Sequence, residues 1–289
     1  MHVLFCLVLS LFFAMPAQAG SAGVVVALKP DKNPEKMLTE RGALAAFVGD
    51  ALGGPVEVIV PLSAATIIEG LANGTIDVGY LSATDMRNAR QAKAAGLLLA
   101  GEIKGKTSYS SYWVTLKDKP YASIEDLRGR PVAFASRTST SGFLIPMRDL
   151  QKRGLLSADG NAEGFFGKGN VQFGTGYVSA VERVFSGEAE AAAVSDYVME
   201  EDKHLSAEQR EKLRVFQSQG PVPTHVIAAS AALNEERRAA IKAALLSLNE
   251  PGNMALRDQL FTSKLVETDE ATHLAPIDEA LKAIGVAAP

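Results

Sequence analysis

The sequence contains a single cysteine, Cys6, and this scarcity excludes several kinds of site. Cys6 lies in the opening segment "MHVLFCLVLSLFFAMPAQAG", a short apolar stretch that ends in the small-residue pattern Ala-Gln-Ala at 17–19. Such a stretch is typical of a cleavable secretion signal. We expect residues 1–19 to be a signal peptide and the mature chain to reside in a bacterial periplasm. That chain would have no disulfide, no thiol nucleophile and no cysteine metal ligand. Because the first residues include no Lys or Arg, an uncleaved membrane anchor is the alternative.

An excess of positive charge and long apolar runs are also lacking. The 29 Lys and Arg residues against 33 Asp and Glu residues give a net charge of -4, which excludes the basic surface that nucleic-acid binding requires. After the opening segment, no run is long and apolar enough to span a bilayer. With 289 residues and 47% hydrophobic side chains, the chain can bury one or two substantial cores. Because the net charge is negative, any anion site must act through local contacts.

Histidine is scarce as well, and no catalytic motif accompanies it. The chain after residue 19 has His204 in a charged segment, His273 near the end, and His225 in "VPTHVIAAS", where it could face a cleft. No GxSxG, HExxH, phosphate-binding loop or paired-cysteine pattern is found. We therefore expect no catalytic residue, no metal site and no cofactor, and an enzyme is the least favoured class of function.

What the sequence does contain is an alternation of short apolar segments and helical patterns. Between most of the apolar segments lie stretches with helical spacing, such as "ATIIEGLANG" and "AVERVFSGE". This alternation predicts α/β layers with mostly parallel sheets, whereas the residues from Asn234 onward predict helices alone. We expect buried strands at 24–28, 56–61, 76–81, 131–135, 171–174, 190–196 and 226–230.

Two segments form a near-repeat. "IIEGLANGTIDVGYL" and "AVERVFSGEAEAAAVSD" each give a helix, a glycine (Gly74 or Gly187), an acidic residue, a buried strand and a polar end. Nothing recurs at a fixed short period, so this is one supersecondary unit used once in each half of the chain. The pattern predicts two α/β lobes, with the helical end of the chain returning to the first.

The segment "PVAFASRTSTSGFLIPM" at 131–147 places Ser139, Thr140 and Ser141 where a strand changes into a helix. A helix N-terminus offers unpaired backbone N–H groups and the positive end of the helix dipole. Hydroxyl groups beside it add donors that carry no charge, so the segment predicts a site for a phosphate-like anion. The alternative is that one of these residues is merely an N-cap. Gly142 is expected to let the backbone approach the ligand, and Pro146 to limit the first turns of the helix.

Several segments, in this order, resemble the phosphate/phosphite/phosphonate-binding proteins of ABC importers. The Ser-Thr-Ser-Gly element with its downstream proline is the most specific of them. The segments are "PDKNPEKMLTERGALAAFVGDALG", "ANGTIDVGYLSATD", "YSSYWVTLKDKPYASIEDLRGRPVAF", "TSTSGFLIP" and "SGEAEAAAVSD".

The resemblance implies a type II periplasmic binding protein of two α/β lobes joined by two crossing strands. Lobe 1 would hold residues 20–111 and 225–289, and lobe 2 would hold residues 112–224. A phosphonate, phosphite or phosphate ion would lie in the cleft and pass to a permease and ATPase in the inner membrane. We expect a monomer that binds no nucleic acid. The alternative partner is a histidine-kinase ectodomain, since a sensor would also respond to lobe closure.

The resemblance also implies roles for particular residues. Ser139, Thr140 and Ser141 would grip the oxyanion, Tyr109 would reach it from the end of lobe 1, and Tyr80 occupies a position that is usually aromatic. The chain departs from the pattern at Tyr177, where relatives often have histidine, and at Ser110, where they often have arginine. Both departures bear on which anion is bound.

Asp196 is the acid that the resemblance places in the cleft. A carboxylate there would accept a hydrogen bond from a protonated P–OH group or pair with an ammonium group of the ligand, and it would repel sulfate. From the residues alone, Asp196 is better explained as the cap of a helix that begins near Tyr197.

Overall fold

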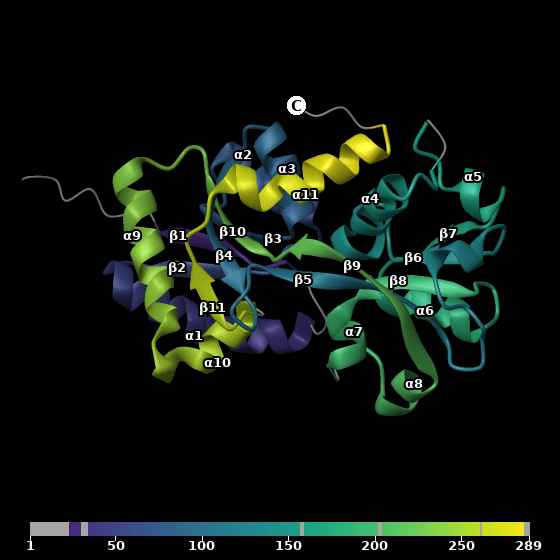
Figure 1. Ribbon diagram of the computed structural model, residues 1–289. Helices are drawn as coiled ribbons and strands as arrows, with labels where there is room; N and C mark the ends of the chain where they lie inside the picture. Colours follow the sequence, from purple (N-terminus) through teal and green to yellow (C-terminus); the bar gives the residue numbers. More distant parts are fainter. Residues whose placement is uncertain (1–22, 30–33, 157–158, 202–203, 261, 286–289) are drawn as a thin grey trace, which may run out of the picture.

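The computed structural model describes residues 23–29, 34–156, 159–201, 204–260 and 262–285. The predicted signal peptide lies outside these residues. Two β-sheets lie side by side with helices packed around both, and the long strands β5 and β9 run between them (Figure 1). The strands are β1 (Val24–Ala27), β2 (Val56–Ile59), β3 (Val78–Leu81), β4 (Ala95–Glu102), β5 (Ser108–Leu116), β6 (Val132–Phe134), β7 (Val171–Phe173), β8 (Ala191–Ser195), β9 (Leu213–Pro223), β10 (Val226–Ser230) and β11 (Lys264–Val266).

Most helices are adjacent in the sequence to a strand of the sheet against which they pack. The helices are α1 (Pro34–Leu52), α2 (Ala64–Asn73), α3 (Ala83–Gln91), α4 (Ile145–Lys152), α5 (Glu163–Phe166), α6 (Tyr177–Phe185), α7 (Asp196–Glu200), α8 (Ala207–Glu211), α9 (Glu235–Leu246), α10 (Met254–Arg257) and α11 (Glu270–Ala283). Within the described part of the chain, no helix combines the length and apolar character needed to cross a membrane.

Both sheets are mixed, not mostly parallel as the sequence predicted. The first has the order β11-β4-β10-β3-β1-β2, in which β1 is parallel to β2 and β3, while β10 and β11 pair antiparallel to their neighbours. The second has the order β7-β6-β8-β5-β9, in which β6 is parallel to β7 and β8, and β5 is antiparallel to β8 and β9.

The difference arises from β10, which was predicted as a strand but pairs antiparallel, and from strands that the sequence pattern did not reveal. A parallel pair requires a crossover helix, so strand–helix alternation identifies parallel strands well. Strands β4, β9 and β11 pair antiparallel and lack that signature. The expectation of helices alone after Asn234 is therefore wrong, because β11 forms the edge of the first sheet.

The predicted near-repeat is present as α2–β3 and α6–β8, one unit in each sheet. Ser63 caps α2, its Oγ accepting from the N–H of Thr66 at 3.2 Å. Gly74 and Gly187 end the two helices with φ of 77° and 78°, a left-handed conformation that favours glycine. Each unit thus delivers a buried strand whose carboxyl end leads directly into another helix.

The chain passes between the sheets twice. It leaves the first sheet after β4, turns through residues 103–107 and enters the second sheet at β5; it returns through Thr224 and His225 into β10. The predicted boundary after residue 111 falls inside β5, and the predicted return at residue 225 falls directly before β10. The assignment of residues 20–111 and 225–289 to lobe 1 and of residues 112–224 to lobe 2 remains a prediction.

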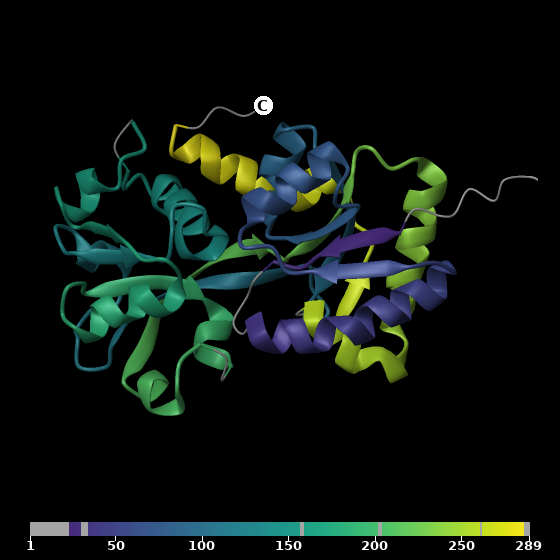
Figure 2. The same ribbon diagram turned by 180° about the vertical axis from the view of Figure 1, so that it is seen from behind.

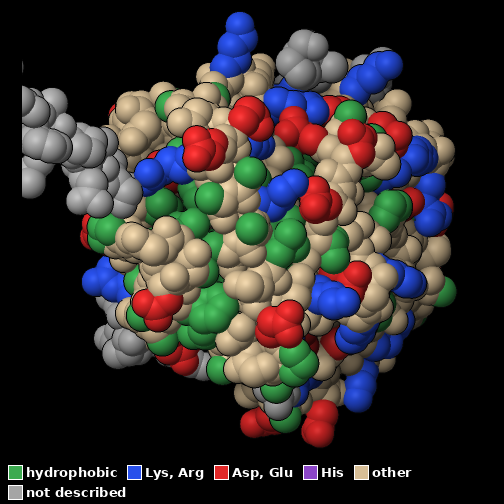
Figure 3. All heavy atoms as spheres, turned by 90° about the vertical axis from the view of Figure 1, so that its left-hand side faces the viewer, with side chains coloured by type: hydrophobic (Ala, Val, Ile, Leu, Met, Phe, Trp, Pro, Cys, Tyr) green, Lys and Arg blue, Asp and Glu red, His purple; other side chains and the backbone are tan. Residues whose placement is uncertain are grey.

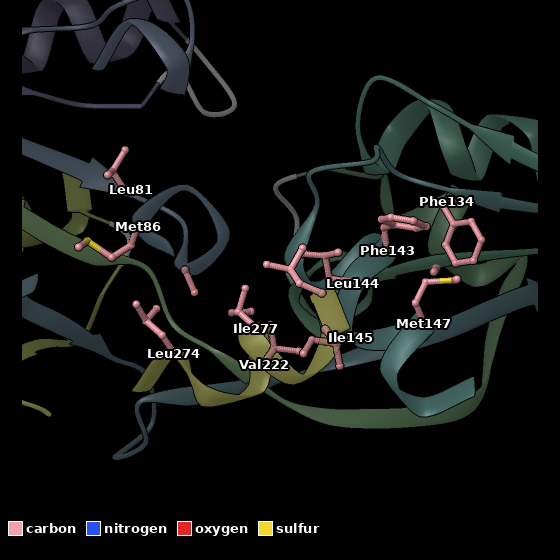
Figure 4. Packing of buried hydrophobic residues seen from close by; sticks show 14 of the residues in the cluster. Leu81, Met86, Phe134, Phe143, Leu144, Ile145, Met147, Val222, Leu274 and Ile277 are labelled. Atoms are coloured by element: carbon pink, nitrogen blue, oxygen red, sulfur yellow. The ribbon is translucent and has the colours of Figure 1, made fainter. Parts of the chain in front are cut away.

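Helix α11 packs against both sheets' helices, as the views from front and back show (Figures 1 and 2). We define the α11 seam as the buried side chains Leu274, Ile277, Ala280 and Leu281. Figure 4 shows Ile277 between Met86 of α3 and Ile145 of α4. Ion pairs flank the seam: Arg90 to Asp278 at 2.8 Å on the α3 side, and Arg148 to Glu279 at 2.8 Å on the α4 side. The last helix therefore joins the two halves of the molecule.

The face of the first sheet that is remote from the second carries charges of both signs. Figure 3 shows acidic and basic side chains interspersed with apolar ones, without a continuous field of one sign. Helix α9 contributes Glu235 and Glu236 to its own first turn, where negative charge is favourable, and Asn234 caps it.

Candidate ligand-binding site

A cavity of about 150 Å³ lies between the two sheets. It is reached by the carboxyl ends of parallel strands from both, namely β1 and β3 of the first sheet and β6 and β7 of the second, which is where open α/β sheets bind ligands. Its lining consists of Lys29, Ser82, Tyr109, Ala135, Ser136, Thr138, Ser139, Thr140, Gly176, Tyr177, Tyr197 and His225. Eight of these twelve residues carry a hydroxyl group, and none of the described lining residues is Asp or Glu.

The first sheet contributes Lys29, which follows β1, and Ser82, which follows β3. Lys29 Nζ donates to Asp85 Oδ2 at 2.7 Å, and Ser82 Oγ donates to the same oxygen at 2.6 Å. Ser82 also caps α3, because its Oγ accepts from the N–H of Asp85 at 3.1 Å. Asp85 thus holds Lys29 at the cavity wall. The position of Asp85 is itself fixed, because its backbone N–H is bonded to the N-cap Ser82 in the first turn of α3.

The hydroxyl-rich segment begins a helix where the sequence predicted one, but its first turn is a π-helical turn, which is wider than an α-helical turn. Ser139 is the N-cap of a single π-helical turn at Thr140–Leu144 that continues into α4, and its Oγ accepts from the N–H of Gly142 at 3.0 Å. Thr140 Oγ1 and Thr84 Oγ1 lie 2.7 Å apart and form a hydrogen bond between the two halves of the molecule. π-Helical turns are rare and frequent at functional sites. Ser139 is both a cap and a cavity-lining residue, so the two alternatives do not exclude each other.

Pro146 leaves two carbonyl groups of this turn free to form hydrogen bonds with the second sheet. Proline has no N–H, so the carbonyl groups of Ser141 and Gly142 are not bonded by residue 146. Ser141 O accepts instead from Ser111 Oγ at 2.6 Å, and Gly142 O accepts from the N–H of Ala135 at 3.1 Å. Ser111 Oγ in turn accepts from Gln219 Nε2 at 2.7 Å. A buried relay from β9 through β5 therefore fixes the hydroxyl-rich turn.

Gly142 has a different role from the one expected. A Cβ atom at this position would lie 2.5 Å from Ala135 Cβ, 2.8 Å from Ser139 Oγ and 3.2 Å from the Tyr177 ring. Glycine is required because the turn packs against β6 and α6, and Gly142 is not part of the cavity lining. The expectation that it lets the backbone approach a ligand is not supported.

Three tyrosines form one wall of the cavity. The rings of Tyr109 and Tyr197 have centroids 6.0 Å apart, and those of Tyr177 and Tyr197 lie edge to face at 5.8 Å. Ser141 is fully buried behind this wall, with its Oγ 2.7 Å from Tyr177 OH. Burial, with Tyr177 nearby, raises the pKa of Tyr109 well above its usual range. The Tyr109 hydroxyl is therefore neutral at physiological pH and can donate a hydrogen bond to an anion.

Asp196 is the first residue of α7 and does not line the cavity. Its Oδ2 accepts from the N–H of Ser110 at 2.8 Å, and its Oδ1 accepts from the N–H of Tyr197 at 2.8 Å. Burial raises the pKa of this carboxyl, and the two backbone N–H groups oppose the rise. The structure thus places Asp196 where it fixes the strand carrying Tyr109 and the start of the helix carrying Tyr197.

Tyr80 is also buried and lies outside the lining. Its ring stacks on that of His225, with centroids 5.1 Å apart and planes inclined by 10°. The structure thus brings Ser139, Thr140, Tyr109 and Tyr177 together around the cavity, and places Ser141, Asp196 and Tyr80 one layer behind. Arg137, inside the hydroxyl-rich segment, turns away and lies over the Phe173 ring at 4.0 Å.

Sequence reasoning missed Lys29 and Tyr197. Lys29 directly follows the first predicted strand, so its position at a carboxyl end was a usable signal. Tyr197 follows the acid that the resemblance had singled out, on the adjacent position of a short helix. Among the described residues, no group of His, Cys, Asp and Glu is arranged to hold a metal ion.

The arrangement of two mixed α/β sheets with a cavity between strand ends is that of a type II periplasmic binding protein. The chain belongs to the family of periplasmic substrate-binding proteins of phosphonate ABC transporters, whose model matches residues 26–273. Over 181 residues it is 23% identical to the phosphate-import protein PhnD of Mycolicibacterium smegmatis, a match that covers 61% of this chain and 56% of that protein. The match therefore spans little more than half of the relative's length.

Solved structures agree on the fold at low sequence identity. XAC2383 of Xanthomonas citri, solved with bound ATP, has a TM-score of 0.77 and 18% identity, covering 93% of this chain and all of that one. PhnD1 of Prochlorococcus marinus, solved with methylphosphonate, has a TM-score of 0.74 and 18% identity, covering 92% and 99%. A binding-protein component of a phosphonate transporter from Pseudomonas aeruginosa has a TM-score of 0.72 and 15% identity, covering 90% and 86%.

Proposed function

We propose that this protein captures a small phosphorus oxyanion, namely a phosphonate, phosphite or phosphate, in the cavity between its sheets. The observation that carries the proposal is the composition of the lining, in which eight of twelve residues bear hydroxyl groups and none of those described is acidic. Hydroxyls can donate to every oxygen of a tetrahedral anion without contributing charge. A protein of net charge -4 can hold an anion in this way because the donors act at short range.

The size of the cavity supports a small ligand. Its volume is about 150 Å³. Pockets for drug-sized molecules hold about 300–1,000 Å³. A single tetrahedral anion with at most a short substituent fits this space better than a nucleotide.

In this proposal some residues around the cavity contact the anion and others position those residues. Ser139, Thr140, Tyr109 and Tyr177 donate hydrogen bonds to the anion, and Lys29 supplies positive charge. Ser141, Asp196 and Tyr80 hold the donors in place through the contacts described above. Asp196 therefore has a positioning role, because its oxygens are taken by backbone N–H groups at 2.8 Å.

Family membership supports the role of the periplasmic binding component of an ABC importer. In this proposal the protein is exported by its signal peptide and acts as a monomer. The hydrogen bond between Thr84 and Thr140 joins the two halves beside the cavity. Closure of the halves over an anion would bring their outer surfaces into one arrangement, which a permease can recognise. The same surface would serve a sensor that docks on a histidine-kinase ectodomain. Genes adjacent on the chromosome separate the two uses: permease and ATPase genes favour import.

The ligand is tested by titrating the unfolded-and-refolded, ligand-free protein with phosphate, phosphite, methylphosphonate, an aminoalkylphosphonate and sulfate, using isothermal calorimetry. We expect one phosphorus oxyanion to bind with 1:1 stoichiometry and sulfate to bind far more weakly. Absence of binding by all four phosphorus compounds would contradict the proposed function.

The role of the Thr140 hydroxyl is tested by a pair of variants. Thr84→Val removes its hydrogen-bond partner, whereas Thr140→Val removes the hydroxyl itself. A hydrogen bond to a charged group contributes about 1.5–3 kcal/mol, so Thr140→Val should weaken anion binding by roughly tenfold to a hundredfold more than Thr84→Val. Equal losses in the two variants would mean that Thr140 only joins the two halves.

A further inference from the structure

We infer that a second pocket of this protein binds a small zwitterion with an apolar body, of the chemical class of the apolar amino acids. The pocket lies beside β7, between the start of α4, residues 159–163 and the end of α11. None of the residues that line this pocket lines the cavity between the sheets. The inference therefore goes beyond the proposed function and does not depend on it.

The pocket has the size of a ligand site and is enclosed in part by close packing. Its volume is about 400 Å³, within the range of about 300–1,000 Å³ that ligand pockets occupy. Residues 159–161 press against the end of α11: a Cβ atom at Gly160, whose φ is 72°, would lie 2.7 Å from Ala283 O. All eleven lining residues belong to the described part of the chain. The second half of the molecule and the last helix thus build this pocket together.

Apolar side chains make up a large part of the lining. The rings of Phe143 and Phe173 meet edge to face, with centroids 5.2 Å apart, and Phe143 and Met147 belong to the apolar cluster that Figure 4 shows. An apolar or aromatic group that enters the pocket would lose contact with water, which is favourable. The apolar lining residues besides alanine and glycine are Phe143, Met147, Val171, Phe173 and Ile284.

Arg137 supplies a positive charge to the pocket. Its guanidinium lies over the Phe173 ring at 4.0 Å, and within the described residues it has no hydrogen bond or ion pair. A guanidinium that lies on a ring keeps its N–H donors in its own plane, where two of them match the two oxygens of a carboxylate. Arg137 can therefore bind the carboxylate of a ligand whose apolar part lies beside Phe173.

Asp159 and Glu163 supply negative charge from another wall of the pocket. Asp159 Oδ1 accepts from the N–H of Asn161 at 3.0 Å, and Glu163 Oε1 accepts from the N–H of Gly169 at 3.1 Å. These bonds fix the direction of both carboxylates. The second oxygen of Glu163 accepts no hydrogen bond from any described residue. It can accept one from an ammonium group of a ligand.

A zwitterion matches this combination of charges. A simple anion would meet the two acids, and a simple cation would meet Arg137, whereas a zwitterion pairs with both. Residues 157–158 and 286–289 adjoin the pocket in the sequence, lie outside the described residues and contain no charged side chain. The charges of the lining are therefore the ones that a ligand meets from these segments of the chain.

The test is isothermal calorimetry of the full chain with L-phenylalanine and L-leucine, without any oxyanion. The analogues are 3-phenylpropionate, which lacks the ammonium group, and 2-phenylethylamine, which lacks the carboxylate. We expect at least one amino acid to bind with 1:1 stoichiometry and to raise the melting temperature. Each analogue should bind roughly tenfold to a hundredfold more weakly than L-phenylalanine, because it lacks one charge-assisted contact.

The variants Arg137→Met and Glu163→Gln should each weaken binding of the amino acid by about tenfold or more. Arg137→Met should also remove the advantage of L-phenylalanine over 2-phenylethylamine. Arg128→Met is the matched control. Arg128 also lies over a phenylalanine ring, that of Phe165 at 4.6 Å, but it does not line the pocket, so this variant should bind like the parent.

Several results would overturn the inference. It is wrong if the folded parent binds neither amino acid, or if Arg137→Met and Glu163→Gln bind as tightly as the parent. Equal binding of 3-phenylpropionate and L-phenylalanine would show that the site takes an anion and not a zwitterion. A melting curve of each variant shows that it is folded, and either variant answers alone if the other is not. Because no oxyanion is present, none of these results bears on the proposed function.

Discussion

The junction between the two sheets has two sides that are built from opposite kinds of side chain. On the cavity side, hydroxyl groups of both halves face each other, and Thr84 and Thr140 share a hydrogen bond. On the other side, the α11 seam forms part of one apolar cluster that includes Met86 and Ile145. Water can replace hydrogen bonds between hydroxyls at little net cost, whereas exposing apolar surface costs about 25 cal/mol per Å². Opening should therefore occur at the cavity, with the α11 seam intact.

The largest expected effect comes from breaking the apolar side. Ile277 is fully buried between the two halves, so Ile277→Ala removes packing atoms and leaves a cavity. Such truncations cost about 2–5 kcal/mol. We expect the free energy of unfolding, measured by urea denaturation, to fall by that amount, while affinity for the oxyanion changes by less than a few fold.

The exposed apolar Met254, 59% accessible on α10, provides the matched control. Met254→Ala shortens a side chain that does not belong to the seam and should leave stability nearly unchanged. A large loss of anion affinity in Ile277→Ala would show that the α11 seam takes part in closure, and the contrast between the two sides would not hold.

A smaller effect should follow from cutting the relay behind the cavity. Ser111→Ala leaves Gln219 Nε2 and Ser141 O without their hydrogen-bond partner, which costs about 1–3 kcal/mol for buried groups. Because the relay fixes the turn that carries Ser139 and Thr140, we expect Ser111→Ala to lose both stability and anion affinity in parallel denaturation and calorimetry experiments.

Thr115→Val is the control for this relay. Thr115 lies on the same strand, and its Oγ1 donates to Glu190 O at 2.7 Å, away from the cavity. The two changes should destabilise the protein similarly, but only Ser111→Ala should weaken binding. If both variants bind like the parent, the turn keeps its shape without the relay.

The sequence predicts the parallel part of each sheet and the position of the hydroxyl-rich turn, because crossover helices and strand ends leave a local pattern. It predicts less about which side chains reach the cavity. Ser141 adjoins Thr140, yet the π-helical turn buries Ser141 against Tyr177 and leaves Thr140 at the wall. Lys29 and His225 lie nearly two hundred residues apart and line the same cavity because β1, β3 and β10 are neighbours in one sheet. Side-chain direction and sheet order are set by tertiary packing, which periodicity does not encode.

The smallest expected effect is a pH dependence of stability that arises from His273, on the α11 side of the junction. His273 lies on the α11 side, 6% exposed, with Nε2 3.0 Å from Thr224 O, and burial lowers its pKa below the ordinary value. Since the unfolded chain then binds the proton more readily, His273 has no effect on stability above about pH 6.5, where it is neutral in both states. As the pH falls below that value, the unfolded state gains the proton first and stability decreases until the lower folded pKa is reached.

We expect the melting temperature of the anion-free protein to fall between pH 7 and pH 5. His273→Gln, which can still donate to Thr224 O but does not titrate, should flatten this part of the profile. The carboxyl groups with lowered pKa, such as Glu190 beside Lys119, lose their contribution only in more acidic solution. Asp196, whose pKa is raised by burial, changes stability in the opposite direction as the pH falls, so the comparison of the parent with His273→Gln isolates the effect of the histidine. A melting profile that is as steep in His273→Gln as in the parent would contradict the assignment of this pH dependence to His273.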